Sequence, residues 1–270
     1  MATATLTTNT VPSERVNPVV TRQRGEWWRQ FAQPLHALRG IIYPPLCLVC
    51  DVDLEHPDER FCATCLAEMI RVGEPACQRC ASRVGPHVDT SHGCLACRRQ
   101  NHRFDAAVRL GTYEGKLRET CLSFKSVHNE LLGPALTRLF IKFQGEFLQS
   151  VRADMVVAVP LHFVRFFQRG FNQAESLARG LAAQLQVPHG SRILKRVRKT
   201  RPQSELKRDE RRDNVHDAFR AKASPHLKGA TVLLVDDILT TGATCSDAAR
   251  ALKAAGAERV VVAVVARSQE

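Results

Sequence analysis

The clearest hydrophobic pattern of the chain lies near its carboxyl terminus. An apolar run at residues 232–235 predicts a buried strand, small and apolar residues at helical spacing predict a helix over 245–255, and the apolar run at 260–265 predicts a second buried strand. Gly256 directly follows the helix and is placed to cap it. A strand, a helix and a second strand in this order form one βαβ unit of a parallel sheet.

Elements of the same kind precede this unit. Residues 104–111 alternate apolar and polar like a strand, and the apolar run at 155–159 predicts a core strand. Helical periodicity is found at 116–126, 130–149 and 173–186. Strands that alternate with helices favour an α/β fold built on a parallel sheet.

The amino-terminal segment has a different character. Residues 1–25 are rich in threonine and unpatterned, which predicts a disordered tail. Residues 26–46 carry large apolar side chains at helical spacing and predict a helical lead-in that packs on the segment after it, with a helix lying on a membrane surface as the alternative. The apolar residues of the lead-in are Trp27, Trp28, Phe31, Leu35, Leu38, Ile41 and Ile42.

Length and targeting signals set the broad class of protein. A chain of 270 residues accommodates one α/β domain of about 150 to 170 residues and a small additional module. Residues 1–20 contain no apolar segment of the kind that directs secretion, and no run reaches the roughly 18 apolar residues of a membrane span. These features predict a cytoplasmic protein without a membrane span.

An acidic pair and a hydroxyl-rich loop follow the strand at 232–235. The strand is expected to end at Asp236 and Asp237, whose carboxylates can accept hydrogen bonds from the vicinal hydroxyls of a ribose. The loop after them opens a helix, where unpaired N–H groups and the helix dipole favour an anion such as a phosphate. Simple capping of the helix by these side chains is the alternative. The residues predicted to bind the phosphate are Thr240, Thr241, Gly242, Ala243 and Thr244.

Eight of the ten cysteines form four C-x-x-C pairs. Each pair can present two thiolates to one metal, and tetrahedral zinc needs two pairs, so the eight thiolates predict two structural zinc ions. Spacers of 11 residues inside the first four cysteines and 13 inside the second suit two consecutive ribbons, although a cross-braced arrangement is also open. The alternatives are a disulfide scaffold, which requires secretion, and a redox or iron–sulfur role. The predicted ligands are Cys47, Cys50, Cys62, Cys65, Cys77, Cys80, Cys94 and Cys97, whereas Cys121 and Cys245 are predicted to be buried small hydrophobes.

The segment VLLVDDILTTGAT resembles the phosphoribosyl pyrophosphate (PRPP) motif of type I phosphoribosyltransferases. In that motif paired acids hold the ribose hydroxyls and the following loop holds the 5'-phosphate. Together with PPLCLVC, the paired C-x-x-C segments, TYEGKLRE, AVPLHFVRFFQRGFNQAE and TRPQSELKRDERRDNV, it makes residues 41–267 similar to the ComF family, which comprises competence-associated, phosphoribosyltransferase-like bacterial proteins with a zinc ribbon. One segment departs from the family pattern: Lys125 matches a lysine of the family, but the turn after it does not.

The resemblance implies a fold and a division of the chain. The fold is a type I phosphoribosyltransferase-like open parallel sheet with an N-terminal double zinc ribbon. The ribbon would occupy residues 47–100 and the phosphoribosyltransferase-like domain 101–270, with a hood over the site at about 190–222.

Further site residues follow from the same resemblance. Leu161, His162 and Arg169 occupy the position of the loop that contacts pyrophosphate, and magnesium would accompany PRPP. A guanidinium such as that of Arg169 can pair with two diphosphate oxygens at once. A loop histidine that hydrogen-bonds only to the backbone is an equal alternative for His162.

Charge concentrates in the predicted hood. The net charge is +12, and residues 192–222 hold 12 Lys or Arg against 5 Asp or Glu. Such a segment can close on PRPP, bind nucleic acid or form a solvated surface, and it lacks the interleaved aromatic residues of a platform for stacking bases.

Two classes of function therefore stay open. One is an enzyme that binds PRPP or a nucleotide 5'-phosphate and transfers the phosphoribosyl group with release of pyrophosphate. The other is a non-catalytic protein of DNA uptake that binds single-stranded DNA or partners such as a competence helicase. No pocket for an acceptor base is evident in the hood, so the acceptor is not identified.

Overall fold

The computed structural model describes residues 45–126, 129, 131–161, 170–198 and 215–269. The predictions for the tail, for most of the helical lead-in, and for His162 and Arg169 lie outside these ranges. None of the helices within them is both long and apolar enough to cross a bilayer.

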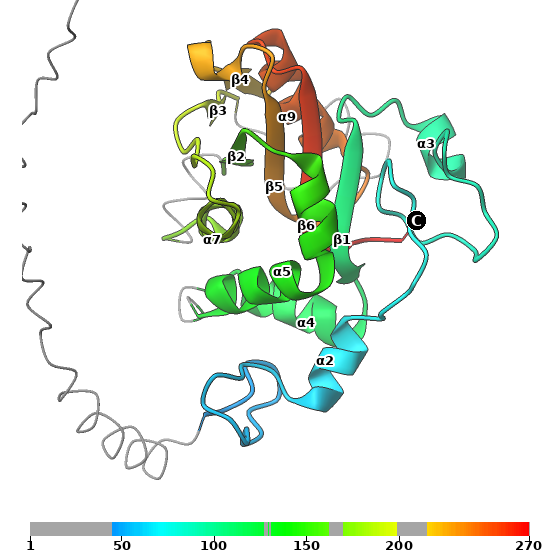
Figure 1. Ribbon diagram of the computed structural model, residues 1–270, viewed down its shortest axis with the longest axis vertical. Helices are drawn as coiled ribbons and strands as arrows, with labels where there is room; N and C mark the ends of the chain where they lie inside the picture. The colour runs from blue at the N-terminus through cyan, green and yellow to red at the C-terminus, as the bar shows by residue number, and fades with distance from the viewer. Residues whose placement is uncertain (1–44, 127–128, 130, 162–169, 199–214, 270) are drawn as a thin grey trace, which may run out of the picture. The chain divides into compact units, whose positions relative to one another are not determined.

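Four parallel strands form the central sheet. Their order is β1 (Ala106–Thr112), β6 (Arg259–Arg267), β5 (Thr231–Leu239) and β2 (Met155–Ala158). Figure 1 shows β5 and β6 in the interior of the sheet, between the two edge strands. The parallel α/β fold predicted from the hydrophobic pattern is therefore confirmed.

Helices cover both faces of the sheet, as the continuous apolar strands require. The side chains of β5 alternate between two apolar clusters: Leu233 and Val235 belong to one cluster, and Val232 and Leu234 to the other. The first cluster is completed by α4 (Gly115–Ser123), α5 (Leu132–Val151) and α7 (Gln173–Leu185), and the second by α9 (Ala243–Ala254).

A small antiparallel pair of strands, which the hydrophobic pattern did not predict, lies in the region expected to form the hood. It consists of β3 (Leu194–Arg196) and β4 (Phe219–Ala221), and the short helix η3 (Pro225–Leu227) follows it. The carboxylate of Asp247 in α9 accepts hydrogen bonds from three successive backbone N–H groups, those of residues 217 to 219. One buried carboxylate thus attaches the start of β4 to α9.

The carboxyl-terminal end of β5 differs from the prediction. The strand was expected to end at Asp236, but it continues to Leu239. The reason is its partner strand, because β6 remains in register with β5 as far as the pair Leu239 and Arg267. The acidic pair therefore lies on the last part of a strand, where the backbone is held on one side by β6.

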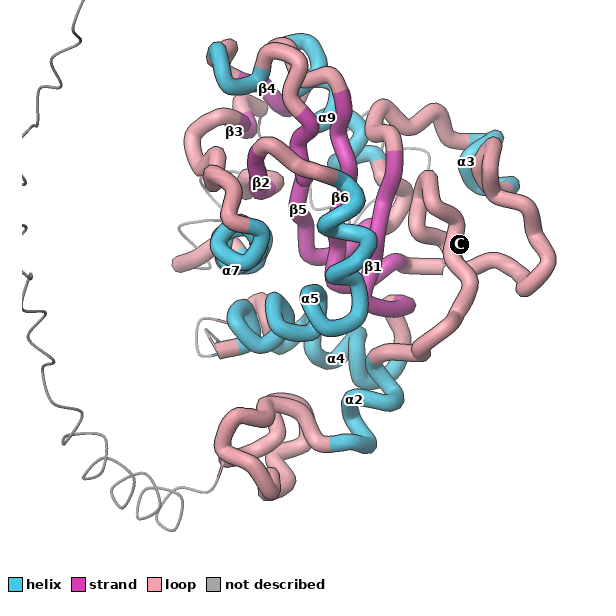
Figure 2. The backbone as a smooth tube through the Cα atoms, in the orientation of Figure 1, coloured by secondary structure: helices cyan, strands magenta, loops and turns pink. Residues whose placement is uncertain are grey.

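The cysteine-rich segment contains mostly loops. Its helices are α2 (Ala63–Met69) and α3 (Leu95–Arg99), each of which begins immediately after a cysteine. Figure 2 shows the long irregular stretches around these two short helices. Such a segment has little regular structure of its own, so another interaction must hold its loops together.

The contact between α2 and β1 requires a glycine. A Cβ atom on Gly111 would collide with the carbonyl oxygen of Met69 and lie 2.8 Å from Leu117 Cδ2. We expect Gly111→Ala to lower the free energy of unfolding by about 1 to 3 kcal/mol, because the backbone of α2 must move away from the sheet. Gly145→Ala is the matched control, since no atom lies within 4 Å of a Cβ there and the position is inside α5. The control should raise stability by about 0.5 to 1 kcal/mol in urea unfolding, and equal effects of the two substitutions would contradict the contact.

Candidate functional site

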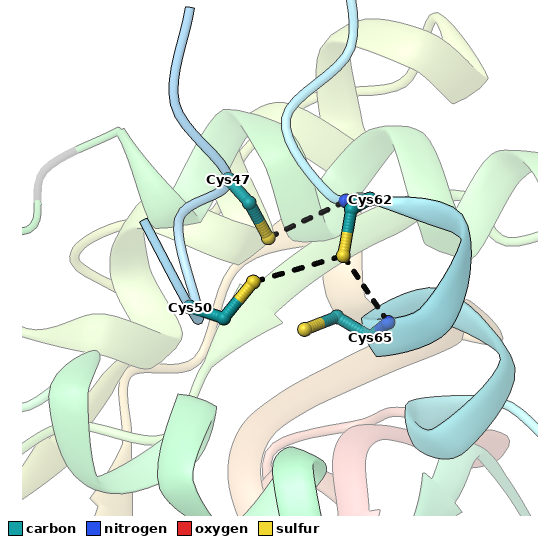
Figure 3. A group of neighbouring side chains, drawn as sticks. All are labelled: Cys47, Cys50, Cys62 and Cys65. Carbon is teal, nitrogen blue, oxygen red and sulfur yellow. Dashed lines mark hydrogen bonds between the residues drawn. The ribbon is translucent and has the colours of Figure 1, made fainter. Parts of the chain in front are cut away.

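The eight paired cysteines form two clusters. Within each cluster the four sulfur atoms all lie within 4.8 Å of one another. The sulfur atoms of the first cluster point toward a common centre (Figure 3). The clusters are Cys47, Cys50, Cys62 and Cys65, and Cys77, Cys80, Cys94 and Cys97. The pairs therefore combine consecutively, and the cross-braced alternative is wrong.

The sulfur separations suit zinc and exclude disulfides. Cys50 and Cys62 are 3.7 Å apart, and Cys80 and Cys94 are 3.5 Å apart. A tetrahedral site with Zn–S bonds of about 2.3 Å places its sulfurs about 3.8 Å apart, whereas a disulfide bond is about 2.05 Å long. All ten cysteines are free thiols in the structure. The donor set thus fits two structural zinc ions, one in each four-cysteine site.

The two sites are built from the same backbone motif. At the first cysteine pair of the first site Asp51 N donates to the carbonyl of Cys47, and at the first pair of the second site Ala81 N donates to the carbonyl of Cys77. The donor residue has a positive φ in both cases, 58° for Asp51 and 56° for Ala81. We call the two units the first zinc ribbon (residues 45–69) and the second zinc ribbon (residues 75–99). A repeated motif of this kind explains why the spacing of the pairs predicted consecutive ribbons.

The acidic pair of β5 lies at the carboxyl end of the sheet, and both residues are half-buried. Asp236 Oδ1 accepts a hydrogen bond from the backbone N–H of Asp237 at 2.9 Å, and Asp237 Oδ1 accepts one from Ile238 at 2.8 Å. Asp236 Oδ2 also accepts a hydrogen bond from Cys245 Sγ at 3.6 Å, so bonds from within the domain hold both carboxylates in place. Burial, and then the neighbouring charge of Asp237, raises the pKa of Asp236 well above its usual range.

The five residues predicted to bind phosphate, 240–244, connect β5 to the start of α9, and we call them the phosphate loop. Gly242 is the N-cap of α9 and has a φ of 75°, and Thr241 Oγ1 accepts a hydrogen bond from Ala243 N at 3.4 Å. A Cβ atom on Gly242 would lie 2.7 Å from His102 Cε1. Both the backbone conformation and the close neighbour therefore require glycine here.

Lys125 adds a positive charge to the site. Its Nζ lies 3.7 Å from Asp237 Oδ2, although Lys125, which follows α4, and Asp237 on β5 are far apart in the sequence. In the sequence, only the match of this lysine to the ComF pattern indicated a functional role, and the match did not show which group the lysine contacts. The arrangement brings an amino group to the same end of the sheet as the two carboxylates.

The loop after β2 supplies the other side of this region. Asn172 caps α7 through a bond from Ala174 N and donates to the carbonyl of Val159 at 3.1 Å, which ties the two ends of this loop together. Leu161 is half-buried in the described part of the loop. Because α7 covers one face of the sheet and α9 the other, the ends of β2 and β5 form a topological switch point, where ligands bind in open α/β sheets.

Two known domain families match the chain. The phosphoribosyl transferase domain matches residues 169–270. The double zinc ribbon domain matches residues 38–98. The first range contains the acidic pair and the phosphate loop, and the second contains all four C-x-x-C pairs.

Several curated proteins are similar to the chain over most of its length. Competence protein F of Haemophilus influenzae is 28% identical over 226 residues, which cover 82% of this chain and 96% of that protein. DNA utilization protein YhgH of Salmonella typhimurium is 29% identical, and the match covers 83% of this chain and 98% of that protein. Competence protein ComFC of Bacillus subtilis is 25% identical, and the match covers 79% of this chain and 90% of that protein.

Among solved structures, the glutamine PRPP amidotransferase from B. subtilis complexed with ADP and GMP is similar to part of the chain. The TM-score is 0.35 at 20% sequence identity, and the match covers 53% of this chain and 30% of that chain. The fold assignment rests on the parallel sheet and the domain families.

Zinc analysis tests the two four-cysteine sites. We expect two zinc ions per chain, and Cys65→Ser or Cys97→Ser should each lower the content to one. A chelator should unfold residues 47–97 and spare most of the sheet, because so small a module depends on metal ligation for its folding energy. Native mass spectrometry and atomic absorption measure the metal. Less than one zinc per wild-type chain, or stable disulfides between the pairs, would contradict the assignment.

Proposed function

The chain belongs to the ComF family of competence-associated proteins, and from that premise we propose that its carboxyl-terminal domain binds PRPP, or a nucleotide through its 5'-phosphate, at the end of β5. The observation that supports this proposal most directly is the acidic pair beside the phosphate loop. The pair is half-buried at the end of a strand, and the loop opens the helix that follows.

The chemistry of the two groups matches the two ends of a ribose 5-phosphate. Carboxylate oxygens accept hydrogen bonds from vicinal hydroxyls, so Asp236 and Asp237 suit the ribose. Backbone N–H groups and hydroxyls at a helix start suit the phosphate, and Gly242 lets the backbone come close to it. Burial raises the pKa of Asp236, which agrees with a carboxyl group in a site that excludes water.

Transfer of the phosphoribosyl group is the reaction that we assign to this site. Pyrophosphate would leave C1 of the ribose, with magnesium on the diphosphate and the loop at Leu161, His162 and Arg169 holding its oxygens. Lys125 lies where its charge would help to hold the anionic ligand. The acceptor is not assigned, because no described group marks a base pocket.

A second candidate function, binding of single-stranded DNA in the cytoplasm, is favoured by the surface of the β3–β4 pair. Lys195 and Arg220 lie directly opposite each other on the two strands, and both are exposed. Like charges in this position repel, so an anionic partner would stabilise the pair. Arg192, Arg198 and Lys222 extend the exposed positive surface. This role would place the protein in DNA uptake beside a competence helicase.

The acidic pair provides the test of PRPP binding. We expect Asp236→Asn combined with Asp237→Asn to weaken PRPP binding by roughly 2 to 4 kcal/mol, because charged hydrogen bonds contribute about 1.5 to 3 kcal/mol each and seldom add fully. Folding should survive, since amides relieve the burial of charge. Calorimetry with magnesium measures the affinity, and ribose 5-phosphate and AMP should compete.

Thr241→Val serves as the companion variant, because it removes a hydroxyl of the phosphate loop and leaves the acids in place. It should weaken the binding of AMP, which has a 5'-phosphate, more than the binding of adenosine, which has none. No binding of PRPP, AMP or ribose 5-phosphate at millimolar concentration would refute the proposed site.

The salt dependence of DNA binding tests the second function. Lys195→Gln with Arg220→Gln should weaken binding of a single-stranded oligonucleotide and lower the slope of log K against log salt by about 0.7 for each phosphate that the variant no longer neutralises. Arg118→Gln with Lys228→Gln is the matched control, since both residues are exposed and lie outside β3 and β4. Fluorescence anisotropy measures both quantities. An equal effect of the two double variants would show that net charge, and not this surface, attracts the DNA.

A further inference from the structure

One buried side chain connects the second zinc ribbon to the base of the phosphate loop. Arg267 is the last residue of β6 and is fully buried. Its Nε donates to the carbonyl of Cys80 at 3.0 Å. Its Nη1 donates to the carbonyl of Leu239 at 3.0 Å and also to that of Thr240, the first residue of the loop. The same guanidinium therefore holds a zinc-ribbon carbonyl and the backbone that enters the loop.

The charge of Arg267 has no carboxylate partner within salt-bridge distance among the described residues, and its Nη2 has no hydrogen-bond partner among them. Arg109, the other buried arginine of this region, differs because Glu74 lies 2.6 Å from it. An unneutralised buried cation is costly. A zinc ion with four thiolates carries a formal charge of about −2, so the loaded second ribbon supplies the missing negative charge beside Arg267.

The chain that leaves the second zinc ribbon also contacts the loop and the start of α9. Arg103 N donates to Ser246 Oγ in the first turns of α9 at 3.0 Å. The ring of His102 stacks on Phe104 at 4.6 Å and lies against Gly242. The segment that directly follows the second zinc ribbon thus contacts the phosphate loop at Gly242 and α9 at Ser246.

The first zinc ribbon makes contacts of another kind. Its helix α2 packs on α4, and Arg138 of α5 donates to the carbonyl of Asp58. In the described ranges no hydrogen bond joins the first ribbon to the phosphate loop. The two ribbons share one motif and differ in what they support, so each is a control for the other.

We propose that the second zinc ribbon holds the phosphate loop in its ligand-binding conformation, and that Arg267 is the positioning residue that makes the loop depend on zinc. This inference rests on the proposed function, because it concerns the site that binds the 5'-phosphate. Loss of zinc from the second ribbon removes the charge beside Arg267 and releases the carbonyl of Cys80. The backbone at Leu239 and Thr240 then loses its fixed support.

Equivalent cysteines in the two ribbons give the first test. Cys97→Ser and Cys65→Ser each remove the last ligand of one zinc site, and both cysteines are buried. We expect Cys97→Ser to raise the dissociation constant for magnesium-PRPP about tenfold, the usual scale for loss of a supporting group, and Cys65→Ser to change it by less than about twofold. Equal effects of the two variants would overturn the proposal.

Substitution of Arg267 tests the connection without removing a metal ligand. Arg267→Met keeps the apolar stem and removes the guanidinium, and Arg259→Met, at the exposed start of the same strand, is the control. Arg267→Met should raise the PRPP dissociation constant about tenfold, and Arg267→Lys should lie between it and the wild type, because lysine keeps the charge but cannot span the carbonyls. Wild-type affinity in Arg267→Met would overturn the proposal.

Zinc release gives a readout that a merely structural arginine would not change. Coupling between the binding of zinc and the binding of PRPP is reciprocal. PRPP should therefore slow the extraction of zinc by a chelator from the second ribbon and leave extraction from the first ribbon unchanged. In Arg267→Met this protection should disappear. Protection that persists in this variant, or that is equal for both ribbons, would contradict the coupling.

Hydrogen exchange without ligand separates this inference from the proposed function. The amides of residues 240–246 should exchange faster in Cys97→Ser and Arg267→Met than in Cys65→Ser and Arg259→Met. If wild-type protein binds no PRPP but shows this difference, the proposed ligand is wrong and the zinc-dependent support of the loop remains. If the exchange rates of all four variants agree, the support itself is refuted.

Discussion

The parallel pairing of β5 with β2 on one side and β6 on the other is the constraint on which the rest of the structure depends. It forces β5 to be apolar on both faces, so polar chemistry on this strand is confined to its carboxyl end. The same pairing brings the ends of β2, β5 and β6 to one edge of the sheet. Arg267 at the end of β6 therefore lies beside the phosphate loop, which directly follows the acidic end of β5.

The zinc ribbons depend on metal ligation and not on an apolar core for their stability. Their loops bury few apolar side chains, and the two small apolar clusters there consist largely of the cysteines themselves. Metal ligation therefore supplies the folding energy that the loops lack. Once folded, the ribbons do not support the same parts of the domain, because the first packs on α4 and α5 and the second on the end of β6 and the loop.

Much of this arrangement was predictable from the sequence, for identifiable reasons. Three strands of the sheet contain continuous apolar runs and β1 alternates apolar and polar residues. The spacing of the C-x-x-C pairs allowed few arrangements, of which the consecutive one is confirmed. The end of β5 was predicted wrongly because two acids normally interrupt a strand, whereas pairing with β6 carries it to Leu239. Local pattern does not reveal such long-range pairing. β3 and β4, with three residues each, are too short to give a pattern.

Single residues that act through tertiary contacts were the hardest to foresee. Lys125 matched a family lysine, but only the fold brings it to Asp237. Arg267 had one signal, a charged residue that ends an otherwise apolar strand, and arginine in that position is usually exposed. Apart from the carbonyl of the neighbouring Ser268, its carbonyl partners lie 187, 28 and 27 positions away, so no motif contains them. The roles predicted for Asp236, Asp237 and the phosphate loop remain predictions.

The most direct measurement of the central claim is a titration of isotopically labelled protein with AMP, followed by amide chemical shifts. If the end of β5 binds a ribose 5-phosphate, AMP will cause its largest chemical-shift changes at the amides of residues 236–244. Adenosine, which lacks the phosphate, will leave the amide shifts of residues 240–244 unchanged. Shifts confined to β3 and β4, or equal shifts with AMP and adenosine at residues 240–244, would contradict the account.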